Sequence, residues 1–116
     1  MADRSFLAWP FFDPHHAELA HALDAWAADT VDDLIDHHDV DGSCRRLVEA
    51  LAGAGWLDLV MPSSHGGRHE RIDVRSVCLA REVLGYHAGL ADFAFAMQGL
   101  GTGPISLFGS ATQKDR

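Results

Sequence analysis

The sequence is short of cysteine and lacks any long hydrophobic run. Two cysteines exclude a disulfide-stabilised scaffold, so Cys44 and Cys78 are expected to be ordinary small apolar residues in a reduced, cytoplasmic protein. No stretch reaches the roughly 18 apolar residues of a transmembrane helix, and no membrane partner is expected. The N-terminus also lacks a basic segment followed by an apolar one, which argues against a secretory signal.

Basic residues are scarce in the first third of the chain. Residues 1–41 contain ten acidic residues and Arg4 as their one base, a net charge of −9, whereas residues 42–116 contain seven acids and eight bases. The whole chain carries a formal charge of −8, which excludes a nucleic-acid-binding domain because such domains present a basic face. We interpret the acidic segment as a solvated outer face.

Signals for strands and for repeats are also missing. No internal repeat or low-complexity tract occurs, and alternating apolar and polar residues are rare. Hydrophobic residues make up 47% of the 116 residues, which is enough for the core of one domain. Helical periodicity dominates, and it predicts an all-α fold, an orthogonal or up-down bundle of about five to six helices.

Capping residues mark where the first helices begin. Asp13 and Pro14 predict the start of a first helix, and residues 36–42 break its pattern. A second helix is expected from about Ser43 to Gly53, and a third from its cap Asp73 to about Tyr86. The expected inner face of the third helix is apolar: Val74, Val77, Cys78 and Leu84.

Residues 1–12 form an arm that is rich in aromatic side chains. Phe6, Trp9, Phe11 and Phe12 lie in it, with Pro10 between them. Such side chains are costly to leave in water, so we expect the arm to pack on a partner surface. The expected organisation is therefore an arm over residues 1–12 and a helical domain over residues 13–116.

Residues 90–98 are apolar nearly all round and predict a helix buried on most sides. After the glycines at 99, 101 and 103, which permit a bend, Pro104 is expected to start a short helical turn that ends at Phe108. Ser110 and Gln113 predict a capping box for a further helix. One stripe with the spacing i, i+3, i+4 and i+7 is either core packing or one wall of an apolar pocket: Phe93, Ala96, Met97 and Leu100.

Eight histidines raise the question of a metal site. Two histidine ligands on a helix need a spacing of three or four. His65 and His69 have this spacing, but Gly66-Gly67 between them makes a helix improbable, and His16 and His21 diverge. We therefore expect no metal site.

No other chemical motif is complete. Residues 36–42 do not match a calcium loop, and Ser63-Ser64-His65 does not lie in a Gly-x-Ser-x-Gly turn. The glycines at 99–103 follow a helical pattern, whereas a dinucleotide-binding motif follows a strand. The sequence offers no catalytic constellation.

Several segments, in this order and spacing, resemble the N-terminal helical domain of the acyl-CoA dehydrogenase family over residues 43–116. They are Arg46–Leu57, Val60-Met61-Pro62 with Gly66-Gly67, Cys78–Leu84, and Gly99–Ser110 with Gln113-Lys114. Trp9–Asp13 and Leu23–Ala27 resemble a bacterial branch of the same family.

This resemblance implies an enzyme that holds FAD and dehydrogenates an acyl-CoA thioester, important in fatty acid metabolism. A carboxylate base takes the α proton, the flavin N5 takes the β hydride, and electrons pass to an electron-transfer flavoprotein. Family members are homotetramers or dimers with an N-terminal helical domain, a middle β domain and a C-terminal helical bundle. This sequence stops just after Gln113-Lys114, so the middle and C-terminal domains are absent from it.

The resemblance assigns no catalytic residue to this chain, because the base of most members is a glutamate in the C-terminal bundle. Neither Glu82 nor Asp92 is given that role, the FAD-binding residues are unknown, and the chain alone is expected neither to hold FAD nor to turn over. The helix that matches residues 90–101 lies beside the acyl chain, which makes its stripe the expected substrate-binding residues: Phe93, Ala96, Met97 and Leu100. The alternatives are a non-enzymatic helical module for interaction or oligomerisation, and a domain of a related acyl-CoA oxidase or flavin monooxygenase.

Overall fold

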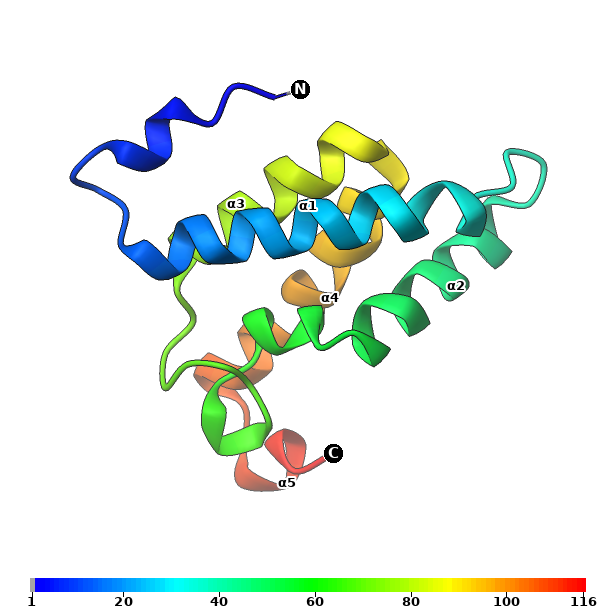
Figure 1. The fold of residues 1–116 in the computed structure, drawn as a ribbon. Coiled ribbons are helices and arrows are strands. Elements are labelled where there is room, and N and C mark those ends of the chain that lie inside the picture. Colours follow the sequence, from blue (N-terminus) through cyan, green and yellow to red (C-terminus); the bar gives the residue numbers. More distant parts are fainter. Residues whose placement is uncertain (1) are drawn as a thin grey trace.

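The protein is all-helical in a computed structural model that describes residues 2–116 (Figure 1). Over these residues it has five α-helices, three short 3-10 helices and, in place of any sheet, one isolated bridge between Pro62 and His69. The elements in chain order are η1 (Ser5–Ala8), α1 (Pro14–Leu34), α2 (Val40–Gly53), η2 (Trp56–Val60), η3 (Ser63–His65), α3 (Val74–His87), α4 (Gly89–Phe108) and α5 (Ala111–Lys114). The predicted all-α fold is confirmed. No helix in residues 2–116 is long and apolar enough to cross a membrane.

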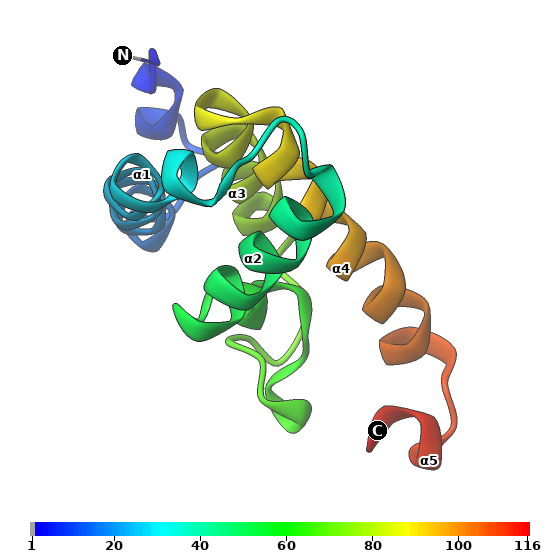
Figure 2. The same cartoon turned by 90° about the vertical axis from the view of Figure 1, so that its right-hand side faces the viewer.

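Helix α1 begins where the sequence predicts. Pro14 is its first residue, and the N–H of the cap residue Asp13 donates to Nδ1 of His16 at 2.9 Å. The α1 helix lies across α3, and the view along α1 shows the two helices in contact (Figure 2). Its buried side chains recur at helical spacing, with Leu23 and Ala27 fully enclosed. The amphipathic pattern therefore places one face of α1 in the core.

The core is made where α1, α2, α3 and α4 meet. Leu23, Leu47, Leu84 and Phe95, one from each of these helices, are fully buried. Burying such a side chain contributes about 1.5–3 kcal/mol relative to leaving it in water. These contacts are the main force that holds four helices of different direction together.

Helix α2 begins at Val40, three residues before the predicted start. Asp39 caps it, because its Oδ1 accepts from the Gly42 N–H at 2.9 Å. Ser43, which was expected to begin the helix, is buried inside it and donates to the Asp39 carbonyl at 2.8 Å. Asp39, an acidic residue directly before α2, therefore serves as the cap of this helix.

The predicted inner face of α3 was wrong at two positions. Val74 is 67% exposed and Cys78 is exposed, whereas the polar Ser76 is fully buried together with Leu79 and Ala80. Small side chains at 76 and 80 face the other helices, and Ser76 is accommodated because its Oγ donates to Asp73 at 2.9 Å. A hydrogen-bonded serine therefore occupies a core position that an apolar pattern alone does not identify.

Helix α4 is continuous where the sequence predicts a bend and a new helical turn. It runs through Pro104, which deprives the Leu100 carbonyl of its intrahelical donor. The helix nevertheless continues to Phe108. The predicted burial on most sides was also wrong, because only Ala91, Ala94 and Phe95 of this helix are buried.

The C-terminal half of α4 projects away from α1 and α3 (Figure 2). The chain is flat as a result, with extents of 42 × 42 × 18 Å and a radius of gyration of 14.6 Å, against about 13 Å for a compact domain of this length. Gly99 lets α4 approach η2 closely, since a Cβ there would lie 3.2 Å from Cγ1 of Val60. The Thr102 hydroxyl donates to the Val60 carbonyl at 3.1 Å and continues this contact.

The chain ends in the predicted capping box. The Ser110 N–H donates to Oε1 of Gln113 at 2.9 Å, and the Gln113 N–H donates to Oγ of Ser110 at 3.3 Å. These two bonds begin α5 beside the end of α4.

The aromatic arm folds back on its own chain in part. The rings of Phe6 and Phe12 meet edge-on at 5.6 Å, and Phe12 meets His16 of α1 at 5.7 Å. Trp9 and Phe11 are exposed, at 58% and 69%. The expectation that the arm packs on a partner surface therefore concerns only these two side chains.

A carboxylate of α1 connects the arm to α3. Asp24 accepts from Arg4 at 2.9 Å and is 2.8 Å from Nε2 of His87. The hydrogen bond from Arg4, and then that from His87, lowers the pKa of Asp24 to about 2.

Two phenylalanines of α4 provide a matched test of the packing. Phe95 is fully buried and Phe93 is 52% exposed. Phe95→Ala should lower the free energy of unfolding by about 3–5 kcal/mol, because a cavity remains in the core. Phe93→Ala should change it by less than about 1 kcal/mol. Urea unfolding followed by circular dichroism measures both, and equal losses would contradict the assigned orientation of α4.

The pairs of Asp24 should make stability depend on pH in the acid range. Its folded-state pKa is about 2 against an ordinary 3.8, so the unfolded chain binds the proton more tightly. The stabilisation is fully present above the unfolded value and is lost as the pH falls through the folded value. Asp24→Asn should therefore cost more stability at pH 7 than at pH 2, measured by urea unfolding. Asp29→Asn, an exposed position on the same helix, is the control. The same loss for Asp24→Asn at both pH values would refute this origin.

Candidate functional site

The apolar stripe of α4 lies mostly at the surface. Phe93, Met97 and Leu100 are 52%, 39% and 66% exposed, and Ala96 is half-buried. Large apolar side chains on one helix face are costly to leave in water. Of the two interpretations that the sequence left open, core packing does not hold within residues 2–116. The stripe is an unpartnered apolar face.

Part of this face borders a groove between α3, α4 and η2. The groove has a volume of about 260 Å³ and is lined by Ala96 and Leu100 of α4, by Val60 and Val77, and by Ile72 before α3. Phe93 and Met97 lie on the same helix as Ala96 and Leu100, on the exposed side. The structure therefore places two of the four predicted residues in the groove and two beside it.

One charged residue, Arg81, lines the groove. Its Nε and Nη2 donate to the two carboxylate oxygens of Asp92 at 2.8 and 3.0 Å. This bidentate hydrogen bond to Asp92 raises the pKa of Arg81. Both carboxylate oxygens of Asp92 accept hydrogen bonds from Arg81, so this carboxylate is not free to act as a general base. The walls of the groove consist of apolar side chains and this ion pair.

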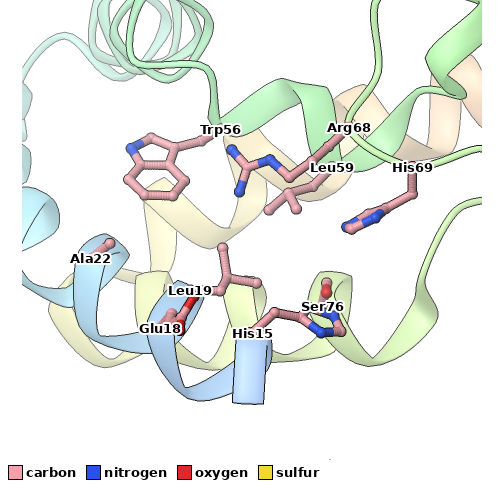
Figure 3. Close-up of a pocket in the computed structure, with 9 residues that line it drawn as sticks. All are labelled: His15, Glu18, Leu19, Ala22, Trp56, Leu59, Arg68, His69 and Ser76. Atoms are coloured by element: carbon pink, nitrogen blue, oxygen red, sulfur yellow. The ribbon is translucent and has the colours of Figure 1, made fainter. Parts of the chain in front are cut away.

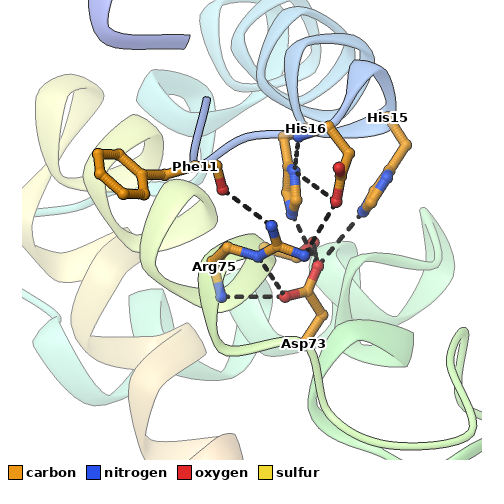
Figure 4. Close-up of polar contacts among 7 residues, drawn as sticks. Phe11, His15, His16, Asp73 and Arg75 are labelled. Atoms are coloured by element: carbon orange, nitrogen blue, oxygen red, sulfur yellow. Dashed lines mark hydrogen bonds and ion pairs between the residues drawn. The ribbon is translucent and has the colours of Figure 1, made fainter. Parts of the chain in front are cut away.

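A polar cluster lies at the other end of α3, around Asp73 (Figure 4). Oδ2 of Asp73 accepts from Nε2 of His16 at 2.8 Å and from Oγ of Ser76 at 2.9 Å, and Nε2 of His15 lies 3.3 Å from it. Its Oδ1 accepts from the Arg75 N–H at 3.2 Å and caps α3. One carboxylate thus connects the start of α1 to the start of α3.

The protonation of His16 follows from its partners. Because the Asp13 N–H donates to Nδ1 of this buried ring, Nδ1 carries no proton and Nε2 must be the donor to Asp73. Burial is the largest influence on Asp73 and raises its pKa. The hydrogen bonds from Ser76, His16 and His15 together outweigh burial and hold the pKa of Asp73 well below its usual range. Asp73 is therefore an anion at neutral pH.

A pocket of about 380 Å³ opens beside this cluster (Figure 3). Leu19, Trp56 and Leu59 form its apolar part, while His15 and His69 lie at its polar end, with ring centroids 5.9 Å apart. His15 and His69 are far apart in the chain, so the spacing of histidines in the sequence does not predict this pair. No local signal identifies it, because α1 and the loop after η3 bring the two rings together.

The chain is similar to one known protein family over most of its length. Residues 13–116 match the family model described as acyl-CoA dehydrogenase, N-terminal domain. The comparison with curated proteins gives no match.

The Asp73 cluster should contribute strongly to stability. Asp73→Ala leaves the buried Nε2 of His16 and Oγ of Ser76 without their acceptor, and each unsatisfied group costs about 1–3 kcal/mol. We expect a loss of about 2 kcal/mol or more in urea unfolding. His15→Ala, which removes a 46% exposed side chain and a 3.3 Å contact, should cost less than about 1 kcal/mol. An Asp73→Ala loss no larger than the His15→Ala loss would contradict the network.

Proposed function

The chain belongs to the acyl-CoA dehydrogenase family through its N-terminal domain, and we propose that it forms one wall of the acyl pocket in an FAD-dependent enzyme. The reaction proposed for the complete enzyme removes hydrogens from the α and β carbons of an acyl-CoA thioester. The observation that carries this proposal is the exposed apolar face of α4, with its adjoining groove.

The proposed role of this face is to bind the acyl chain. Burial of each CH₂ group of a ligand against an apolar wall contributes about 0.8 kcal/mol. Ala96 and Leu100 line the groove, and Phe93 and Met97 extend the apolar surface along the same helix. A wall of this kind excludes water and orients the thioester relative to the reacting groups.

The residues of this face do not fit FAD itself. Between Gly89 and Phe108, Asp92 is the one charged residue, and no lysine or arginine occurs. A dinucleotide cofactor carries a diphosphate, which requires cationic side chains or free backbone N–H groups. The groove offers Arg81, whose guanidinium is already paired with Asp92. We therefore assign no step of flavin chemistry to these residues and place the FAD site elsewhere in the complete enzyme.

The catalytic base is likewise proposed to lie outside residues 1–116. Asp92 is held by Arg81, and the ionised Asp73 serves as acceptor and helix cap in a separate cluster. Transfer of electrons to an electron-transfer flavoprotein and assembly as a homodimer or homotetramer are proposals for the complete enzyme.

A second candidate is a non-enzymatic interaction module. The end of α4 favours it, because Leu107 and Phe108 are 70% and 87% exposed. In an enzyme of the proposed kind, these two side chains pack against further domains. In a non-enzymatic module they bind another chain. Turnover of acyl-CoA by the complete protein separates the enzymes from the non-enzymatic module. Oxygen consumption during turnover separates the oxidase and the monooxygenase from the dehydrogenase.

The acyl-wall assignment predicts a change in chain-length preference. Ala96→Phe in the complete enzyme should lower kcat/KM for a C16 acyl-CoA at least tenfold more than for a C4 acyl-CoA, because the added ring fills space needed by distal CH₂ groups. Ala28→Phe, at an exposed position of α1, is the control and should leave the ratio unchanged. Equal loss for both substrates would indicate damage to packing, and absence of any acyl-CoA turnover in the unmodified enzyme would overturn the proposal.

A further inference from the structure

Three potential metal ligands from separate segments meet at the polar end of the pocket in Figure 3. His15 lies in the first turn of α1, His69 in the loop after η3, and Asp73 at the cap of α3. One ligand atom of each residue lies within 4.8 Å of the others. We propose that these three side chains bind a divalent transition-metal cation, with zinc as the preferred ion.

One pair of these ligand atoms already has the spacing of zinc ligands. Nε2 of His15 and Oδ2 of Asp73 are 3.3 Å apart. Two ligand atoms bound tetrahedrally to zinc at about 2.0–2.1 Å are about 3.3–3.4 Å from each other. The cation therefore takes the place of the hydrogen in the longest of the three contacts at Oδ2. His15 then holds its proton on Nδ1 and binds the metal through the Nε2 lone pair.

Asp73 is held in place by two shorter hydrogen bonds at the same oxygen, Oδ2, so the cation replaces only the third and longest contact, that of His15. Its bonds from His16 and Ser76, at 2.8 and 2.9 Å, involve fully buried side chains and persist when the contact to His15 is replaced. Hydrogen bonds of this kind orient a metal-bound carboxylate and keep it ionised. His16 itself is not a ligand, because its Nδ1 accepts from the Asp13 N–H and its Nε2 donates to Asp73.

The backbone of the loop is fixed at His69 by contacts with the segment around η3. The isolated bridge joins Pro62 to His69, and the Ser63 N–H donates to the His69 carbonyl at 2.8 Å. The His69 side chain is half-buried and faces the pocket, and one of its ring nitrogens lies within 4.8 Å of the ligand atoms of His15 and Asp73.

Charges around the site permit a cation. Glu18 lines the same pocket and adds a negative charge. Arg68 also lines it, but its guanidinium lies over the Trp56 ring at 5.7 Å and donates to the Gly55 carbonyl at 3.2 Å. Arg75 contacts Oδ1 of Asp73, on the side away from the Oδ2 atom that faces the histidines.

The donor set selects the ion. Two imidazoles and one carboxylate suit zinc and related transition metals, whereas magnesium and calcium prefer oxygen ligands alone. Three protein ligands leave a fourth tetrahedral position for water, on the side of the pocket. A bound ion would connect α1, the loop and α3 at one point.

Zinc titration of the metal-free protein tests the site. Isothermal titration calorimetry with ZnCl₂ at pH 7.5 should show one ion per chain with a micromolar or lower Kd. His15→Ala and His69→Ala should each weaken binding at least tenfold, while His38→Ala, at an exposed histidine far along the chain, should leave it unchanged. The thermal midpoint Tm of the wild type should rise with zinc, and that of His69→Ala should not.

The zinc titration contains neither flavin nor acyl-CoA, so its result can be distinguished from success or failure of the acyl-wall proposal. Circular dichroism verifies that each variant is folded, and His69→Asn is a second variant should His69→Ala be unfolded. Absence of saturable binding at 100 μM zinc would overturn the site. So would binding that survives both His15→Ala and His69→Ala, or binding that is lost equally in His38→Ala.

Discussion

The shape of the molecule depends on which side of α4 packs against the other helices. Nearly every side of this helix is apolar, yet its own chain covers a narrow side around Ala91, Ala94 and Phe95. Gly99 then lets the helix contact Val60 of η2 closely, Thr102 continues this contact, and the C-terminal end of the helix projects away from α1 and α3. Because Phe95 anchors the buried side of the helix, the opposite side can present the apolar face of Phe93, Met97 and Leu100 without loss of the core. The candidate acyl wall is therefore a consequence of incomplete burial.

The sequence predicted helix ends better than helix faces. Caps such as Asp13-Pro14, Asp73 and Ser110 with Gln113 depend on hydrogen bonds within four residues, so local residue types suffice to place them. The inner face of α3 depends on which helices cross it. Ser76 is buried because Asp73 accepts its hydroxyl, a contact that an apolar pattern does not reveal. Pro104 favours the start of a new helical turn, whereas α4 runs through it because its other residues remain helical on both sides.

The two candidate sites differ in how far they were predictable. The stripe on α4 follows from residue spacing within one helix, so the sequence predicts it. Whether other helices cover the stripe depends on tertiary packing, which the sequence pattern does not reveal. His15 and His69 are 54 positions apart, and their rings meet only because the loop after η3 folds against the start of α1. A search for ligands at helical spacing tests His65 with His69 and misses this arrangement. Contacts that form across segments require the tertiary fold.

The pocket near the histidines and the groove on α4 have η2 and the start of α3 as a common wall. Leu59 lines the pocket and its neighbour Val60 lines the groove. Ser76 and Val77 divide in the same way at the start of α3. Ile72, at the groove, directly precedes Asp73 of the polar cluster. Since adjacent residues on η2 and α3 face opposite sides of this wall, its backbone cannot shift toward one cavity without moving away from the other. The Asp73 network, which fixes the start of α3, therefore also fixes one side of the apolar groove.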